Sequence, residues 1–199
     1  MFKFLAEEYV NLFTFLNLFN YITFRTGASI LTSLFFSLIF GKYIIKTLSN
    51  IQPLGQPIRN DGPANHIIDK AGTPTMGGIL IILSIAISLI LWADLKNIYI
   101  WISFFSCLLF GLIGFFDDYK KVKSNSSKGL NAKTRIIAQL FISFFVVYLI
   151  QTNLSENINS NIAFPFFKNL VINFGIFYYF IALFIIIGSA NAVNLTDGL

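Results

Sequence analysis

Two adjacent aspartates, Asp117 and Asp118, directly follow an apolar run from Ile98 to Phe116. A carboxylate at the C-terminus of a helix opposes the helix dipole, and a pair of carboxylates beside a membrane core also loses hydration. We therefore expect a cation or another charged partner close by, and a lysine-rich stretch, 120–135, follows at once. This placement predicts that the two carboxylates form part of a functional site.

Neighbouring residues on a helix point about 100° apart, so Asp117 and Asp118 are expected to have different roles, one facing a metal ion and the other orienting a substrate. The alternative is an ordinary surface ion pair between Asp117 and Lys121, one helical turn apart, which contributes only about 0.3–0.5 kcal/mol. That pair accounts for one aspartate and leaves the other unexplained.

A second polar segment, 55–78, ends in Gly-Thr-Pro-Thr-Met-Gly-Gly directly before an apolar run. Thr73 is predicted to cap the following helix, with Pro74 in its first turn, so that free backbone amides form a phosphate site beside Lys70. Taken by itself, the pattern more often shapes a turn and lets helices pack closely through small residues. His66 receives no catalytic role, because one histidine cannot make a zinc site.

The third polar segment closes the sequence. Asn191 and Asn194 share one helix face at the end of the last apolar run, where they are poor residues for lipid contact. Asp197 followed by Gly198 could hold a carboxylate against Mg²⁺ or a nucleotide, although Asx-Gly turns are common without any function. Together the three segments supply what phosphoryl transfer on a diphosphate requires, and a carboxylate site without histidine ligands favours a hard metal ion.

The elements that must position these residues are membrane helices. The sequence is 56% hydrophobic and 12% charged, and its apolar runs are far longer than the strands of an outer-membrane barrel. We predict an all-α, polytopic helical bundle that forms a single transmembrane domain over 1–199 and begins with an interfacial helix within 1–20. The predicted spans are approximately 25–47, 75–93, 98–116, 134–150 and 174–193.

The net charge of +5 comes from bases that lie mostly between the first and second spans and between the third and fourth. Basic residues accumulate on the cytoplasmic side, which predicts an outer N-terminus and places all three polar segments on the cytoplasmic face. Because these bases lie next to membrane spans, lipid rather than nucleic acid is their expected partner. The single cysteine, Cys107, cannot form a disulfide within the chain.

The segments read Gly-Gln-Pro-Ile-Arg-Asn-Asp-Gly-Pro with Gly-Thr-Pro-Thr-Met-Gly-Gly, then Asp-Asp-Tyr-Lys-Lys, then Asn-Ala-Val-Asn-Leu-Thr-Asp-Gly-Leu. With these motifs in this order, the chain resembles the glycosyltransferase 4 family of polyprenyl-phosphate phosphosugar transferases, and within it the phospho-N-acetylmuramoyl-pentapeptide transferases. The resemblance implies transfer of phospho-MurNAc-pentapeptide from its UDP carrier to undecaprenyl phosphate, giving lipid I and UMP. It also implies Mg²⁺, the bacterial inner membrane and an active site on the cytoplasmic face, and it leaves open whether a homodimer forms.

The resemblance also assigns roles to individual residues. It implies that Asp117, Asp118 and Asp197 are catalytic, one of the acidic pair accepting a proton from the lipid phosphate, and that Asp197 and Asp117 are the candidate metal ligands. It places the remaining matched residues in substrate or phosphate binding: Lys70, Thr75, Lys121, Lys133, Asn191 and Asn194. Arg135 could take the role of Lys133, because the motif expects a single lysine there.

The family bundle has about ten spans, of which about five lie within these residues, and the family's further aspartate and histidine-rich loop would lie beyond Leu199. We therefore expect an N-terminal fragment that is inactive and poorly stable alone. Two competing functions remain open: a transferase that uses UDP-N-acetylglucosamine, and a transporter. A transporter site should lie near the middle of the membrane, whereas the charged residues here gather at one face.

Overall fold

The structure is a computed structural model that describes residues 1–55, 72–154, 160–164, 166–167 and 169–197, with 195–197 as backbone only. The chain divides into two compact units, Met1–Gly129 and Leu130–Leu199, and each is described here by itself. Helices occupy the apolar runs of both units, and the described strands form one two-stranded pair. The all-α fold class is confirmed, and the single transmembrane domain over 1–199 stays a prediction.

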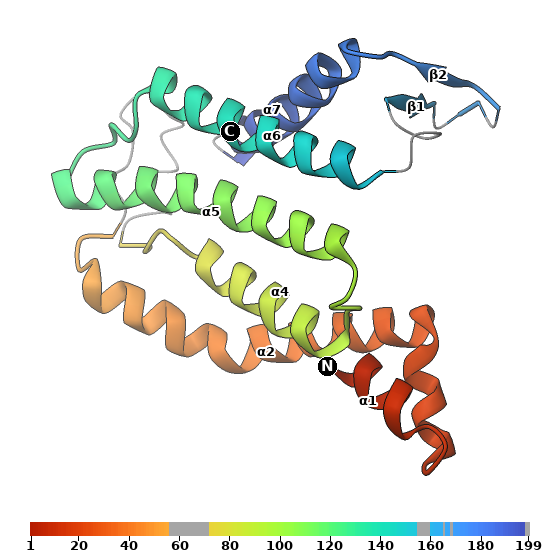
Figure 1. The fold of residues 1–199 in the computed structure, drawn as a ribbon. Coiled ribbons are helices and arrows are strands. Elements are labelled where there is room, and N and C mark those ends of the chain that lie inside the picture. Colours follow the sequence, from red (N-terminus) through yellow and green to blue (C-terminus); the bar gives the residue numbers. More distant parts are fainter. Residues whose placement is uncertain (56–71, 155–159, 165, 168, 198–199) are drawn as a thin grey trace. The chain divides into compact units, whose positions relative to one another are not determined.

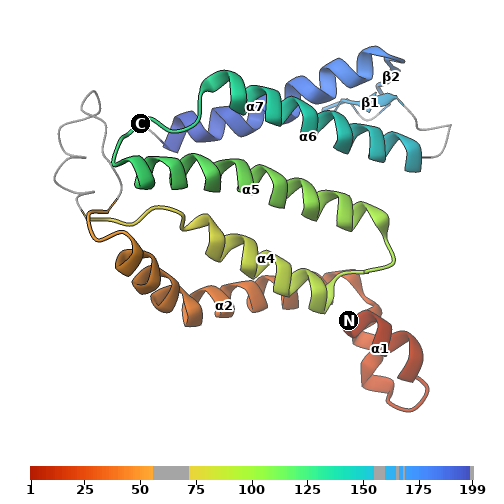
Figure 2. The ribbon, with the colours of Figure 1, turned by 60° about the vertical axis from the view of Figure 1, so that its left-hand side comes forward.

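The first unit contains two short helical segments followed by three long helices. Its elements are α1 (Phe2–Tyr9), the 3₁₀ helix η1 (Thr14–Asn20), α2 (Ile22–Ile51), α4 (Gly78–Trp92) and α5 (Ile98–Ser124). Helix α4 packs against α2 on one side and against α5 on the other, and neighbouring helices run in opposite directions (Figure 1, Figure 2). This alternation brings the end of α2, the start of α4 and the end of α5 to the same end of the unit.

Small side chains line the contact between α2 and α4. The hydroxyls of Ser37 and Ser84 are 2.9 Å apart. A Cβ added at Gly41 would be in ordinary van der Waals contact with the Leu80 side chain. Ser88, one turn after Ser84, is also buried. Small residues allow helix backbones to approach closely where lipid provides no hydrophobic driving force, so this seam fixes α4 against α2.

The interfacial helix predicted within residues 1–20 is two short segments instead. A turn at residues 10–13 separates α1 from η1, and it lets Phe2 and Phe19 place their rings 4.6 and 5.8 Å from the ring of Trp92. Lys3 binds Asp94, and Lys96 binds Glu7 at 2.7 Å. Aromatic packing and these ion pairs therefore hold the N-terminal segment against the turn between α4 and α5.

Four described helices are long and apolar enough to cross a membrane: α2, α5, α6 (Ala132–Asn153) and α7 (Phe177–Asp197). Helix α4 coincides with the predicted span 75–93 but has 15 residues, about 22 Å, against a hydrocarbon core of about 30 Å. The protein is thus a helical membrane protein, and the crossing by α4 stays a prediction.

The second unit contains α6, α7 and a small hairpin between them. Strands β1 (Asn161–Ala163) and β2 (Val171–Asn173) pair antiparallel, with Ile162 opposite Ile172. Helices α6 and α7 pack against each other, and the rings of Phe144 and Tyr179 lie 6.1 Å apart. The inward face of α6 is unusually polar for a membrane helix, since Gln139, Ser143 and Gln151 are buried.

Candidate active site

The acidic pair lies inside α5 and shares one lysine. Lys121 Nζ is 2.6 Å from Asp117 Oδ2 and 3.1 Å from Asp118 Oδ1. Lys121 follows these residues by four and three positions, so the helical repeat itself brings its ammonium group over both carboxylates. Asp117 is only 9% exposed. The ion pair between Asp117 and Lys121 that the alternative expected is formed, but it is not an ordinary surface pair, because Asp117 is buried and Lys121 also binds Asp118.

The helix extends beyond the predicted span 98–116 and carries the pair within it. Helix α5 continues to Ser124, with Lys121 and Lys123 in its last turn and Asn125 as a left-handed C-cap. Lysines near the C-terminus favour the continuation because they complement the helix dipole. Lys121, on the same helix, thus contributes compensating positive charge to both carboxylates.

Thr75 connects the acidic pair to the loop before α4. Its hydroxyl donates a hydrogen bond of 2.6 Å to Asp118 Oδ2. Gln52, at the end of α2, holds the backbone of Thr75: Gln52 Oε1 accepts from the Thr75 N–H at 3.0 Å, and Gln52 Nε2 donates to the Thr75 carbonyl at 3.4 Å. The side chains of Gln52 and Thr75 thus link the end of α2, the loop before α4 and helix α5.

A close approach of two loops fixes this arrangement. Gly55 has φ +68°, and a Cβ at that position would lie 2.7 Å from backbone atoms of Gly72. The Gly55 N–H donates to the Gln52 carbonyl at 2.8 Å. Only glycine fits this conformation and this contact, so the chain after α2 lies directly against the chain that leads to Thr75.

The predicted cap at Thr73 is wrong. Helix α4 begins at Gly78, and its N-cap position is Gly77, which makes no side-chain cap. Met76 has φ +71°, a left-handed conformation that interrupts the helix between Thr75 and Gly77. The helix therefore cannot extend back to Thr73, and phosphate binding by this segment together with Lys70, which lies outside the described residues, stays a prediction.

The described part of the third segment belongs to a network in the second unit. Asn191 Nδ2 donates to Gln139 Oε1 and to the Ile187 carbonyl, both at 2.8 Å. Asn191 Oδ1 accepts from Arg135 Nη2 at 3.2 Å. Gln139 is 5% exposed. Arg135, which sequence reasoning could not separate from its neighbour Lys133, is therefore the residue that contacts this segment.

The remaining predicted site residues are Lys133, Asn194, Lys70 and Asp197. Lys133 on α6 and Asn194 on α7 are exposed within the second unit. Lys70 lies outside the described residues, as does the side chain of Asp197. The joint action of Asp197 with Asp117 and Asp118 stays a prediction.

The donors of the first unit suit a hard cation. Two carboxylates and the Thr75 hydroxyl offer oxygen ligands only, which Mg²⁺ prefers. Among the described residues, no three His, Cys, Asp or Glu side chains come close enough to hold a metal ion. The acidic pair fits Mg²⁺ by donor type and needs further ligands to complete its coordination.

Gln52 was missed by sequence reasoning. It follows the apolar stretch of α2 as an isolated amide in a polar loop, and its partner Thr75 is 23 residues away. A single glutamine at the end of a membrane helix carries no signal by itself. Its 3% exposure and its two bonds to one backbone residue appear only in the folded chain.

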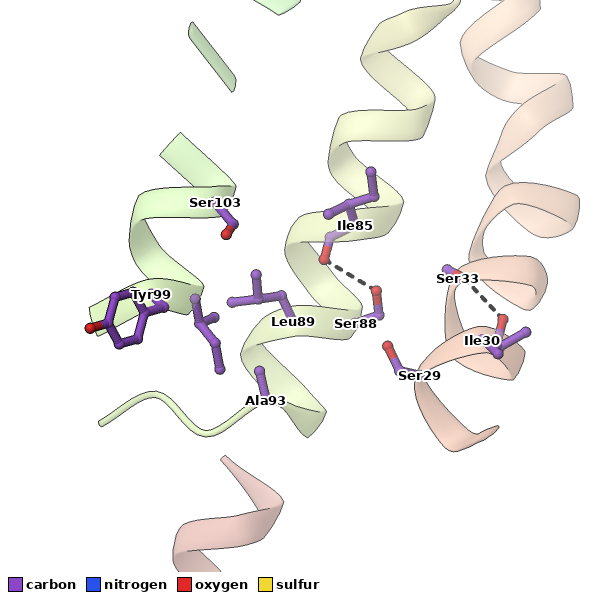
Figure 3. A pocket seen from close by; sticks show the side chains of 10 residues that line it. Ser29, Ile30, Ser33, Ile85, Ser88, Leu89, Ala93, Tyr99 and Ser103 are labelled. Carbon is purple, nitrogen blue, oxygen red and sulfur yellow. Dashed lines mark hydrogen bonds between the residues drawn. The ribbon is translucent and has the colours of Figure 1, made fainter. Parts of the chain in front are cut away.

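A cavity of about 550 Å³ lies elsewhere in the first unit, between the N-terminal part of α2, the C-terminal part of α4 and the N-terminal part of α5 (Figure 3). Serine hydroxyls line it, and those of Ser33 and Ser88 bond carbonyls of their own helices, at Ile30 and Ile85. Ser103, its last lining residue on α5, is about 20 Å along the helix from Asp117. The cavity is therefore separate from the acidic pair.

The fold and the site define a helical membrane protein whose polar residues form a paired-carboxylate centre at one end of its first unit. Residues 99–199 match the model of glycosyl transferase family 4, and the chain belongs to this family. Residues 70–82 match signature 1 of the phospho-N-acetylmuramoyl-pentapeptide-transferases, a stretch that contains Thr75.

Similar proteins agree with this assignment. The phospho-N-acetylmuramoyl-pentapeptide-transferase of Pelagibacter ubique (strain HTCC1062) is 49% identical over 196 residues, which are 98% of this chain and 54% of that protein. The protein of the same name from Rickettsia prowazekii (strain Madrid E) is 51% identical over 183 residues, covering 92% and 50%. The chain thus spans about half the length of the curated relatives it matches.

Proposed function

We propose that the whole protein is a phosphotransferase that moves phospho-MurNAc-pentapeptide from UDP-MurNAc-pentapeptide to undecaprenyl phosphate, with lipid I and UMP as products. The observation that carries this proposal is the hydrogen bond from Thr75 to Asp118. It joins the segment that matches the transferase signature to the acidic pair in the stretch that matches the family model.

The two carboxylates differ in exposure, and this suggests a division of roles. Asp118 is half-buried and oriented by Thr75, so its carboxylate is the group that a lipid phosphate can reach, and we assign it the role of proton acceptor. Asp117 is more buried and is held by Lys121, which suits a ligand with fixed orientation. Lys121 would bind a phosphate oxygen of the donor through its ammonium group.

Mg²⁺ fits the donor set, with Asp117 and Asp197 as the residues that would hold it; when bound it supplies positive charge that neutralises the diphosphate. The chain's own residues then orient the substrates: Lys121 and the segment around Thr75 hold phosphate, while Asn194 and Lys133 complete the binding surface for the nucleotide sugar. We place this reaction at the cytoplasmic face of the bacterial inner membrane, on the distribution of Lys and Arg between the spans.

The test is a transfer assay with the whole protein in detergent or in membranes. UDP-MurNAc-pentapeptide, undecaprenyl phosphate and Mg²⁺ are supplied, and release of UMP and formation of lipid-linked product are measured. We expect turnover that requires all three, and strong losses in Asp117→Asn and Asp118→Asn, since each removes a charge from the site. Asp94→Asn, at the other end of the unit, should retain activity.

The same assay separates the competing functions. UDP-N-acetylglucosamine as donor should give no UMP; release from it at an equal rate would move the protein to the transferases of other sugars. No UMP from either donor would reject the transferase and favour the transporter. Equal losses in all three aspartate variants would reject the assignment of the site.

A further inference from the structure

Gly129, in the loop that follows α5, lies directly against the carboxylate of Asp117. A Cβ added at Gly129 would be 2.6 Å from Asp117 Cγ and 2.7 Å from Oδ2, and closer still to Oδ1. All three of the nearest atoms belong to this one carboxylate. The contact is made across 12 residues, because the chain turns at Asn125 and returns along the last turns of α5.

The backbone conformation does not explain a glycine at this position. The described glycines with positive φ are Gly55, Gly72 and Gly175, and Gly129 is not among them. An L-residue could adopt the backbone of Gly129 without strain, so what excludes a side chain is the space occupied by Asp117.

The carboxylate cannot easily move to make room. Asp117 Oδ2 is bound to Lys121 at 2.6 Å, and the side chain of Asp117 is only 13% exposed. A shift of the carboxylate away from residue 129 would lengthen this ion pair, and a shift of the loop would open the site beside Asp117. A methyl group at position 129 therefore displaces either the Asp117 carboxylate or the loop that contains residue 129.

We propose that Gly129 is a positioning residue: its missing side chain seats the Asp117 carboxylate in the orientation that the reaction needs. This inference rests on the proposed function, in which Asp117 acts at the phosphate-transfer centre. This role of Gly129 differs from a purely structural one, because a side chain at position 129 would displace the Asp117 carboxylate, which belongs to the proposed site.

The test compares Gly129→Ala with Gly114→Ala in the whole protein. Gly114 lies on α5 one turn before Asp117, and a Cβ there meets nothing within 4 Å, so this control adds the same methyl group to open space. Gly129→Ala should lower kcat by about 10²-fold, as expected for a reacting group misplaced by about 1 Å, with KM for the nucleotide donor within about twofold. Gly114→Ala should keep the wild-type kcat.

A second measurement does not depend on activity. The melting temperature is measured for Gly129→Ala in the wild-type background and in the Asp117→Ala background, where the three atoms in the way are removed. We expect a loss of about 3 °C or more in the first background, and a much smaller one in the second, because the two positions are coupled by direct contact.

Each outcome decides the inference. An equal loss of melting temperature in both backgrounds, or a kcat of Gly129→Ala equal to that of Gly114→Ala, overturns it. If the wild-type protein shows no transfer, the proposed function fails, and the double-variant comparison alone then decides whether Gly129 seats the carboxylate.

Discussion

Thr75 and Asp118 are 43 residues apart in the sequence and are joined by a hydrogen bond of 2.6 Å from the threonine hydroxyl to Oδ2 of the aspartate. Hydrogen bonds to an ionised carboxylate are about twice as strong as neutral ones. This bond orients Asp118 from outside its own helix, while Lys121 holds the other oxygen from within it. The orientation of Asp118 is thus set by two elements, the loop before α4 and helix α5.

Thr75→Val tests this bond. Valine keeps the shape of threonine and removes the hydroxyl, so Asp118 loses one of its two orienting partners. A hydrogen bond to a charged group contributes about 1.5–3 kcal/mol, and we expect turnover to fall by about 10- to 100-fold in the UMP-release assay. Thr75→Ser should retain most of the activity.

Thr47→Val is the matched control, because within the described part of the chain the Thr47 hydroxyl bonds only the Tyr43 carbonyl of its own helix. Its turnover should equal that of the wild-type protein. If Thr75→Val also matched the wild type, Asp118 would not depend on the threonine for its orientation.

Gln52→Leu tests the support behind Thr75. Leucine removes both bonds to the Thr75 backbone and leaves a partly buried N–H without its acceptor, which costs about 1–3 kcal/mol of folding free energy. We expect a lower melting temperature and reduced turnover, and Asn50→Leu, at an exposed position two residues earlier, should change neither. In the Gln52→Leu, Thr75→Val double variant the two losses of turnover should not add, since both act through the same hydroxyl. Additive losses would show that Gln52 acts elsewhere.

Asn191 and Asn194 lie one turn apart on α7 and should behave differently. Asn191→Ala removes the partner of buried Gln139 and of Arg135, so we expect a loss of about 1–3 kcal/mol in stability. Asn194→Ala, at an exposed position, should stay within about 0.5 kcal/mol of wild type. If Asn194 binds substrate, this variant loses turnover without losing stability. Thermal unfolding and the transfer assay on both variants separate the two roles, and equal stabilities would contradict the network.

The contact between the N-terminal segment and Asp94 should weaken at low pH. The hydrogen bond donated by Lys3 holds the pKa of Asp94 below its usual range. Because this pKa is lower in the folded chain than in the unfolded chain, the contact stabilises the fold above the ordinary value of about 3.9 and is lost as the pH falls through the folded value. For such a surface pair we expect about 0.2–1 kcal/mol.

Fluorescence of Trp92 reports this contact, because its ring touches Phe2 and Phe19. In a Trp101→Phe background, Trp92 is the remaining tryptophan of residues 1–199, and its emission should change as the pH is lowered through the acidic range. Asp94→Asn should move the emission at pH 7 part of the way toward its low-pH value, because the Lys96–Glu7 pair is retained at that pH. Emission that stays constant down to about pH 2 would contradict the assigned role of this pair.

Much of the first unit follows from the sequence because a membrane leaves the backbone few alternatives. An apolar run such as 98–116 must satisfy its backbone hydrogen bonds internally, so it forms a helix wherever it occurs. The contact of Lys121 with Asp117 and Asp118 follows from the same cause, since residues three and four apart share a helix face. Sequence reasoning therefore found the acidic pair and its lysine.

Contacts between distant segments were decided only by the tertiary structure. The bonds from Gln52 to Thr75 and from Thr75 to Asp118, and the seat of Asp117 on Gly129, join residues whose separations bear no relation to a helical repeat. The start of α4 at Gly78 depends likewise on the left-handed backbone of Met76, which forms where Thr75 is held by its neighbours. Local periodicity determines which residues are helical and which share a face, whereas the packing of α2, α4 and α5 determines which loops meet and how each carboxylate is oriented.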